Sequence, residues 1–337
     1  MPFKSILIAN RGEIAIRVAR AAAELNIRSV AIYAEDDALS LHVRKADAAL
    51  ALNGRGVSAY LDADQIIALA KQAQCDAIHP GYGFLAENAD FAARCEQAGV
   101  CFIGPSSEQL SWFGDKIKAR ALAMRCGVPV LRGTQHATSL EDAERFLRDL
   151  GPDGAIMIKA LAGGGGRGMR AVQSISELAE AYARCQSEAK AAFGNGDVYV
   201  EQLVSAARHI EVQILGDGTG EVTHVWEREC TLQRRNQKVL EVAPSPSLSE
   251  PLRQAIFASA KKLAAQVKYK GLGTFEFLVD TKQSDPANAY FFIEANPRIQ
   301  VEHTVTEQIS GIDLVQTQIA LAAGQSLQQL MLLQSDI

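Results

Sequence analysis

The chain opens with short apolar runs that alternate with amphipathic segments. SILIA at 5–9 is an apolar run of strand length, and the segment 13–25 follows it with apolar residues at helical spacing. VAIYA, a helical pattern at 62–73, DAIH and a helical pattern at 88–98 repeat this order. Strands that alternate with helices are typical of a parallel sheet covered on both faces. The pattern predicts a doubly wound α/β domain over residues 1–113.

Two serines mark the starts of helices beyond a connector at 114–130. Ser139 with Asp142, and Ser174 with Glu177, have the spacing of capping boxes. Two short strand-like runs, AIMIKA and GMRAVQ, lie between these helices on either side of a glycine-rich loop. The stretch 131–203 is therefore predicted to form a small α+β lid.

From residue 204 onward the apolar pattern changes to a period of two. HIEVQIL, EVTHVWERE, TFEFLVD and AYFFIEA all alternate, which is typical of antiparallel strands with one buried face. A helical pattern at 250–267, with Pro251 near its start, interrupts them. These runs predict a second sheet within residues 204–337.

Composition excludes several classes of protein. A net charge of −5 without a basic stripe disfavours a nucleic-acid partner. No apolar run approaches the length of a membrane span, and the first residues lack the pattern of a signal peptide. The six cysteines are scattered without a Cys-x-x-Cys pair, which disfavours a zinc site or a disulfide framework. We therefore expect a cytoplasmic protein with free thiols.

Four consecutive glycines stand between the two short strands, in GGGGRG at 163–168. Glycines let a backbone approach a ligand and turn its N–H groups towards phosphate. The loop is not a P-loop, and it does not open a helix after a strand, which disfavours a dinucleotide-binding site. Taken alone, it also fits a flexible surface hairpin. Lys159 before the loop and Lys116 at the start of a helical run favour a flap over nucleotide phosphates.

Two glutamates and an asparagine lie in strands near the C-terminal end. Glu276 is in the middle of GTFEFLVD, and Glu294 and Asn296 are two residues apart in FFIEANPR, so they share a strand face. If these strands pair as a hairpin, three oxygen ligands converge on one face. Carboxylates bridged to phosphates are the usual way in which Mg²⁺ is held.

Cationic and acidic residues follow directly. Arg298, Gln300 and Glu302 alternate and would share a face in an extended segment. An arginine offers a rigid fork to a carboxylate or bicarbonate, and a nearby glutamate can take a proton. The basic run at 233–238 adds cations from another segment, although such a run is more often a surface patch.

Taken together, the motifs resemble the biotin carboxylase family of ATP-grasp ligases. The resemblance runs from residue 3 to the C-terminus and is most specific in HPGYGFLAEN and NPRIQVEHTVTE. It implies a pre-ATP-grasp domain followed by an ATP-grasp domain with a glycine-flap lid. The matching stretches are IANRGEIA at 8–15, HPGYGFLAEN at 79–88, GPSSE at 104–108, GDK at 114–116, IKALAGGGGRGM at 158–169, RHIEVQ at 208–213, ERECTLQRRNQK at 227–238, GTFEF at 273–277 and IEANPRIQVEHTVTE at 293–307.

The resemblance implies a role for each site residue. Glu302 would be the base that deprotonates bicarbonate, with Arg298 and Lys238 as its catalytic partners. Bicarbonate would attack ATP to give carboxyphosphate, whose CO₂ would carboxylate biotin on a carrier domain. The implied Mg²⁺ (or Mn²⁺) ligands are Glu276, Glu294 and Asn296, and the bicarbonate ligands are Lys238, Arg298, Gln300 and Val301. The implied ATP contacts are Lys116, Lys159, Gly164, Gly165, Gly166, Glu201, Gln202, Leu203, Val204, His209, Gln233, Asn236, Glu276, Leu278 and Glu294.

The chain departs from the family pattern at three points. Position 236 is Asn where many relatives carry His, and position 202 is Gln where some carry Lys. Full-length relatives continue past the equivalent of Ile337, so we expect a C-terminal biotin carboxylase domain, with an arginine that faces biotin, to be missing. Cys230 matches a position once suggested for chemistry, but we expect a buried structural thiol.

Two other functions stay open at this point. One is another ATP-grasp ligase that forms an acyl phosphate, such as a carbamoyl-phosphate or purine-pathway relative. The other is a catalytically silent nucleotide-binding domain, against which the intact lysines and glutamates argue. The resemblance implies a biotin carboxyl carrier domain and a carboxyltransferase as partners, in the same or a separate chain, and a homodimer or larger oligomer. The final acceptor, whether acetyl-CoA, another acyl-CoA, pyruvate or urea, is not specified by these residues.

Overall fold

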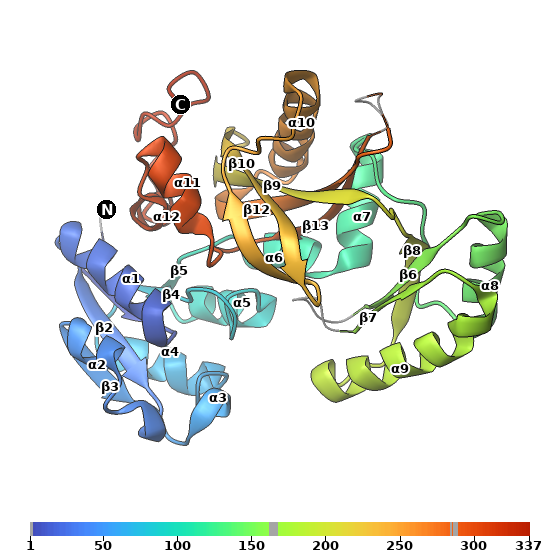
Figure 1. Ribbon diagram of the computed structural model, residues 1–337. Helices are drawn as coiled ribbons and strands as arrows, with labels where there is room; N and C mark the ends of the chain where they lie inside the picture. The colour runs from blue at the N-terminus through green and yellow to red at the C-terminus, as the bar shows by residue number, and fades with distance from the viewer. Residues whose placement is uncertain (1–2, 162–167, 284, 286–288) are drawn as a thin grey trace.

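The computed structural model describes residues 3–161, 168–283, 285 and 289–337. Figure 1 shows an N-terminal α/β region (blue), a lobe built from β6–β8, α8 and α9 (green), and a larger sheet with its helices (yellow to red). The predicted fold class is confirmed, because a parallel sheet is followed by antiparallel sheets. The predicted glycine flap lies, apart from Gly168, outside the described residues, and the predicted domain boundaries stay predictions.

The N-terminal sheet is parallel, with strand order β3-β2-β1-β4-β5. Apolar side chains of β1 are buried on both faces, which explains why its sequence is continuously apolar. Ile6 packs with α1, whereas Leu7 packs with α4 and α5. The elements are β1 (Ser5–Ile8), α1 (Gly12–Glu24), β2 (Arg28–Tyr33), η1 (Glu35–Asp37), α2 (Leu41–Lys45), β3 (Ala48–Ala51), α3 (Gly56–Ala59), α4 (Ala63–Gln72), β4 (Ala77–His79), α5 (Ala89–Gln97) and β5 (Cys101–Phe102).

The connector and the lid region follow. The lid strands form an antiparallel sheet with order β7-β6-β8, packed on α8 and α9. The elements are α6 (Ser107–Gly114), α7 (Lys116–Arg125), α8 (Leu140–Asp149), β6 (Ile156–Ala160), β7 (Met169–Val172), α9 (Ile175–Phe193) and β8 (Val198–Gln202).

Neither predicted capping box is complete, although one of the two serines caps its helix. The Ser139 hydroxyl accepts the Asp142 backbone N–H at 3.1 Å, as a helix cap should. Ser174 precedes α9 without a side-chain cap, because its hydroxyl bonds that of Ser176 at 3.0 Å instead. A complete capping box begins α6 at Ser106, and it was not predicted from the sequence.

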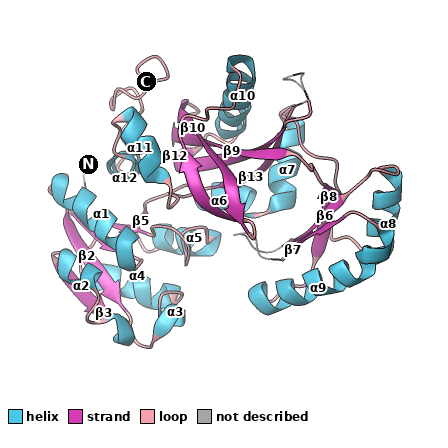
Figure 2. Ribbon diagram, in the orientation of Figure 1, coloured by secondary structure: helices cyan, strands magenta, loops and turns pink. Residues whose placement is uncertain are grey.

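The larger sheet is antiparallel, with order β11-β10-β9-β12-β13 (Figure 2). Even-numbered residues of its central strand β9, such as Ile210 and Val212, pack into a core with α7 and α10. Odd-numbered residues of the same strand therefore face the other side, as the period of two predicts. The elements are β9 (Ala207–Asp217), β10 (Val222–Arg234), β11 (Gln237–Val242), α10 (Glu250–Gln266), β12 (Lys270–Asp280), β13 (Tyr290–Asn296), α11 (His303–Ser310) and α12 (Leu314–Ala322).

Among the helices of the described residues, none combines the length and apolar character that crossing a bilayer requires. All six cysteines lie in described residues and carry free thiols, and only Cys101 is more than slightly exposed.

We expect His79 to make the folded state acid-sensitive. Its side chain is fully buried at the end of β4, where Nδ1 accepts the Gly81 N–H at 3.0 Å. Burial lowers the pKa of His79 to about 3, below its usual value of about 6.5. The unfolded chain therefore binds the proton first, so stability is complete above pH ~6.5 and is lost as pH falls towards 3. This one group accounts for up to about 2 kcal/mol between pH 7 and pH 5.

The measurement is the free energy of unfolding by urea at pH 7 and pH 5. His79→Asn keeps an acceptor for the Gly81 N–H and removes the titrating ring, so its pH dependence should be smaller. His136→Asn, at an exposed histidine, is the matched control and should behave as the parent. Identical pH dependence in the His79 variant and the parent would contradict this assignment.

Candidate active site

One cavity of about 720 Å³ lies between the lid sheet, the larger sheet and the loop after β4. Every described residue that was predicted for the site lines this cavity. These residues are Lys116, Lys159, Glu201, Gln202, Leu203, Val204, His209, Gln233, Asn236, Lys238, Glu276, Leu278, Glu294, Asn296, Arg298, Gln300, Val301 and Glu302. Gly164, Gly165 and Gly166 lie outside the described residues. The roles of the lining residues stay predictions.

A row of charged residues crosses the sheet on the cavity side. Arg228 of β10 lies opposite Glu211 of β9. Glu211 lies opposite Glu276 of β12 on its other side. Glu276 in turn lies opposite Glu294 of β13. Residues directly opposite each other on paired strands share a face of the sheet, and on the other face Glu211 and Glu276 are flanked by buried apolar residues such as Phe275. Strand alternation therefore places all four on one face, and the predicted β12–β13 hairpin is present.

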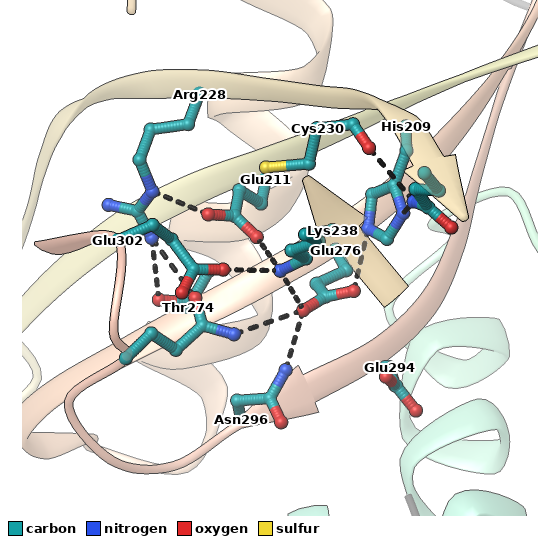
Figure 3. Close-up of polar contacts among 12 residues, drawn as sticks. His209, Glu211, Arg228, Cys230, Lys238, Thr274, Glu276, Glu294, Asn296 and Glu302 are labelled. Carbon is teal, nitrogen blue, oxygen red and sulfur yellow. Dashed lines mark hydrogen bonds and ion pairs between the residues drawn. The ribbon is translucent and has the colours of Figure 1, made fainter. Parts of the chain in front are cut away.

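The Lys238 ammonium is the centre of this cluster (Figure 3). It forms ion pairs with Glu211, with Glu302 at 2.7 Å and with Glu276 at 3.1 Å. Burial lowers the pKa of Lys238, but the three carboxylates outweigh burial and hold the pKa above its usual value. The lysine is therefore a fixed positive charge surrounded by carboxylates.

Glu276 is buried and fully hydrogen-bonded. Its Oε2 lies 2.6 Å from His209 Nε2, and its Oε1 accepts from Asn296 at 2.6 Å and from Gln300 at 3.1 Å. Burial raises the pKa of Glu276, but His209 and Lys238 outweigh it and keep the pKa well below its ordinary range. Glu276 is therefore ionised at neutral pH and available to a cation.

Arg228 belongs to this cluster but was not predicted from the sequence. Its side chain is completely buried, and it forms an ion pair with Glu211. Its remaining N–H groups donate to Gln213 at 2.8 Å, to Thr306 at 2.9 Å, to Gln300 at 3.1 Å and to Thr274 at 3.2 Å. This guanidinium therefore fixes Glu211 and Gln300, two neighbours of the lysine cluster. The available signal was a run of three charged residues at 227–229 within a predicted strand.

The two lysines predicted for phosphate each lie beside a carboxylate. Lys116, at the start of α7, lies 3.5 Å from Glu294. Lys159, on β6, forms an ion pair with Glu201 on β8. Figure 3 shows Glu294 set apart from the cluster around Lys238, on the side of α7. The structure thus brings Glu276 and Asn296 together and holds Glu294 beside Lys116.

The segment after β13 is not a strand, so Arg298, Gln300 and Glu302 do not share a strand face. The backbone turns at Arg298, whose N–H donates to Asn296 O at 2.8 Å, and Glu302 precedes α11. The three side chains still reach the cavity. The Arg298 guanidinium pairs with Glu87 of the N-terminal region and donates to Asn296 Oδ1 at 3.1 Å.

The oxygen donors on this wall fit a magnesium ion. Glu276, Glu294 and Asn296 offer two carboxylates and an amide, which are hard ligands of the kind Mg²⁺ prefers. Glu211 is a poorer donor, because it does not line the cavity and is already paired with the buried Arg228. Cys230 is buried, and burial raises the pKa of its thiol, so it is inert at neutral pH, as expected.

The far end of the cavity is apolar. Leu203, Val204 and Leu278 were predicted there, and the other apolar lining residues were missed. Leu131, Met157, Met169, Leu278 and Ile293 line it together with the strand end at 201–204. Met157 alternates with buried Ile156 and Ile158 on β6, so its exposure to the cavity follows from strand geometry. Tyr82, Gly83 and Glu241 line the opposite end and were also missed.

Two family models match the chain. Residues 2–110 match the model of the biotin carboxylase N-terminal domain, and residues 115–330 match that of the carbamoyl-phosphate synthase L chain ATP-binding domain. The chain is 56% identical to pyruvate carboxylase of Bacillus subtilis over 96% of its length, and 53% identical to mitochondrial pyruvate carboxylase of Homo sapiens over 100%. It spans 28% of the length of each of these curated relatives.

Solved structures are similar over nearly the whole chain. The biotin carboxylase–βγ-ATP complex of Campylobacter jejuni matches with a TM-score of 0.92 and 44% identity, covering 96% of this chain and 72% of that one. The biotin carboxylase domain dimer of Hydrogenobacter thermophilus 2-oxoglutarate carboxylase, solved with MgADP, ADP and bicarbonate, matches with a TM-score of 0.93 and 43% identity, covering 100% and 72%.

Proposed function

Since the chain belongs to the biotin carboxylase family, we propose that its cavity carries out the ATP- and Mg²⁺-dependent carboxylation of biotin by bicarbonate. One observation carries the proposal: the Lys238 ammonium is shared by Glu302 and Glu276 at one end of a cavity whose other end is apolar. This arrangement suits a nucleotide base at the apolar end and an anionic acceptor at the lysine. The match of residues 2–110 favours biotin over the carbamoyl-phosphate alternative.

The proposed reaction divides the cavity into three parts. Leu203 and Leu278 contact the adenine, and Lys116 and Lys159 turn to the phosphates. Glu276, Glu294 and Asn296 would hold Mg²⁺, which neutralises charge on the phosphates. At the other end, Arg298 and Gln300 orient bicarbonate beside Glu302.

The acid–base step falls to Glu302. Its carboxylate takes the last proton of bicarbonate, while Lys238 and Arg298 stabilise the resulting negative charge. A bicarbonate oxygen then attacks the γ-phosphorus, ADP leaves, and carboxyphosphate forms. Carboxyphosphate breaks into CO₂ and phosphate, the phosphate takes the proton of the ureido N–H of biotin, and the resulting nitrogen anion attacks CO₂. The groups that touch bicarbonate thus stabilise charge as it develops, which is where catalysis gains most.

We also propose the partners that this reaction requires. A biotin carboxyl carrier domain would bring biotin to the cavity, and a carboxyltransferase would pass the carboxyl group on. The similarity to pyruvate carboxylases and to a single-chain long-chain acyl-CoA carboxylase supports this. The dimer of the Hydrogenobacter thermophilus domain supports a homodimer or larger oligomer. The six free thiols support a reducing compartment, such as the cytoplasm.

We expect ATP hydrolysis by the intact protein to depend on both bicarbonate and Mg²⁺, and free biotin to raise its rate. The reason is that the γ-phosphorus needs an activated acceptor, and Arg298 and Lys238 offer bicarbonate two cations beside Glu302. Phosphate release is measured with and without added bicarbonate, and with a chelator of divalent metals. Lys238→Gln protein, purified in parallel, controls for contaminating ATPases. An equal rate in bicarbonate-depleted buffer would contradict the proposal.

A further inference from the structure

A buried carboxylate on β8 of the lid sheet is shared by two cations. Glu201, at the end of β8, has a side chain only 2% exposed. Lys159 of β6 forms an ion pair with its Oε1, and Arg120 of α7 approaches its Oε2 at 3.4 Å. Lys159 and Glu201 line the cavity, whereas Arg120 lies behind them. The two cations thus contact different oxygens of the Glu201 carboxylate.

Arg120 is held firmly in this position. Its side chain is buried, and Nη2 donates to the carbonyl of Leu131 at 2.7 Å. The backbone of Gly133 crosses opposite Glu201, and a Cβ added there would lie 3.0 Å from Arg120 Nη2. The guanidinium is therefore packed closely against the backbone at Leu131 and Gly133.

Nucleotide binding is expected to compete with the ion pair between Lys159 and Glu201. Lys159 is expected to turn towards phosphate, which weakens its contact with Glu201. A buried carboxylate that loses its partner is strongly destabilised. Lys116 does not have this difficulty, because its partner Glu294 would gain Mg²⁺ as the lysine leaves. Glu201 is not among the proposed metal ligands and needs another cation.

We propose that Arg120 is a positioning residue for nucleotide binding, which acts as the standing counterion of Glu201 and so releases Lys159 to the phosphates. This inference rests on the proposed function, because it takes nucleotide phosphate as the ligand of Lys159. Arg120 does not touch the nucleotide and acts only through Glu201.

The test is a double-mutant cycle on Mg-ATP affinity, measured by calorimetric titration of the intact protein. In Arg120→Gln, Glu201 has lost one of its two cations and holds Lys159 away from the phosphates more strongly. Mg-ATP affinity should therefore fall about 10-fold or more. In a Glu201→Gln background there is no carboxylate to compensate, so the same Arg120 substitution should change affinity little. Arg120→Lys, which keeps the charge, should keep most of the affinity. Arg125→Gln, an exposed arginine on the same helix, is the matched control.

The outcomes distinguish failure of the proposed function from failure of the role proposed for Arg120. If the parent protein does not bind Mg-ATP, the proposed function fails. If the parent binds but Arg120→Gln binds equally well, the inference is overturned. A structural role alone predicts the same loss from Arg120→Gln in both backgrounds, and that result would also overturn it. Should Arg120→Gln not fold, comparison of Glu201→Gln with the double variant still decides, since the proposal requires equal affinities.

Discussion

Glu302→Gln is expected to lower bicarbonate-dependent ATP turnover about 10²–10⁴-fold, the usual cost of removing a general base. The carboxylate lies 2.7 Å from Lys238, next to Val301, whose exposed side chain forms part of the cavity wall. Glutamine has nearly the same size and keeps a polar oxygen, but it does not accept the bicarbonate proton. The apolar end and the phosphate lysines are untouched, so Mg-ATP affinity should be retained.

The measurement pairs steady-state phosphate release with a separate titration of Mg-ATP. Glu221→Gln, at an exposed glutamate away from the cavity, is the matched control and should keep the parent rate. A Glu302 variant within a factor of about two of the parent would rule out this base. Loss of nucleotide binding together with turnover would point instead to a collapsed lysine cluster.

Arg228→Met is expected to lower the free energy of unfolding by about 3–5 kcal/mol, the usual cost of breaking a buried ion pair. The guanidinium is fully buried, and its loss leaves Glu211 with Lys238 as its cation. It also leaves the oxygens of Gln213 and Gln300 without their donor. A methionine of similar length fills the space but satisfies none of these groups.

Urea unfolding of both proteins gives the difference directly. The control is Arg184→Met, which breaks an exposed pair with Glu180 on α9 and should cost about 1 kcal/mol or less. Glu211→Gln added to Arg228→Met should recover part of the loss, because the buried charge is then removed with its partner. A loss below about 1 kcal/mol in the single variant would show that the Arg228 network is not needed for stability.

Hydrophobic periodicity was enough to predict most strands and helices of this chain. The run HIEVQIL alternates because one face of β9 packs on α10 while the other faces the cavity, and both facts are local to the strand. Pairing Glu276 with Glu294 also follows once the two runs form a hairpin. The register shift between Glu276 and Phe277 does not follow from the sequence, because it depends on how β13 packs rather than on the alternation of residues in β13.

The parts that escaped prediction depend on contacts between distant residues. Arg120 meets Glu201 across 81 positions, and Arg228 meets Gln300 across 72. No local pattern encodes such distances. The turn at Arg298 was missed for a different reason: alternating polar residues read as a strand, whereas a backbone bond to Asn296 bends the chain there. Side chains from a turn reach the same cavity without sharing a strand face.

Strand β9 places unusual limits on how this chain can change its length. His209, Glu211 and Gln213 stand at every second position of one uninterrupted strand, and neighbouring strands flank it on both sides. Inserting or deleting one residue between them would turn every later side chain to the opposite face, sending a carboxylate into the apolar core. A single substitution alters the contacts of one side chain. An insertion or deletion within the strand shifts its register and alters the contacts of every side chain after it. Variation in length can therefore accumulate in surface turns, such as the one at 218–220, while the spacing of these three residues is fixed.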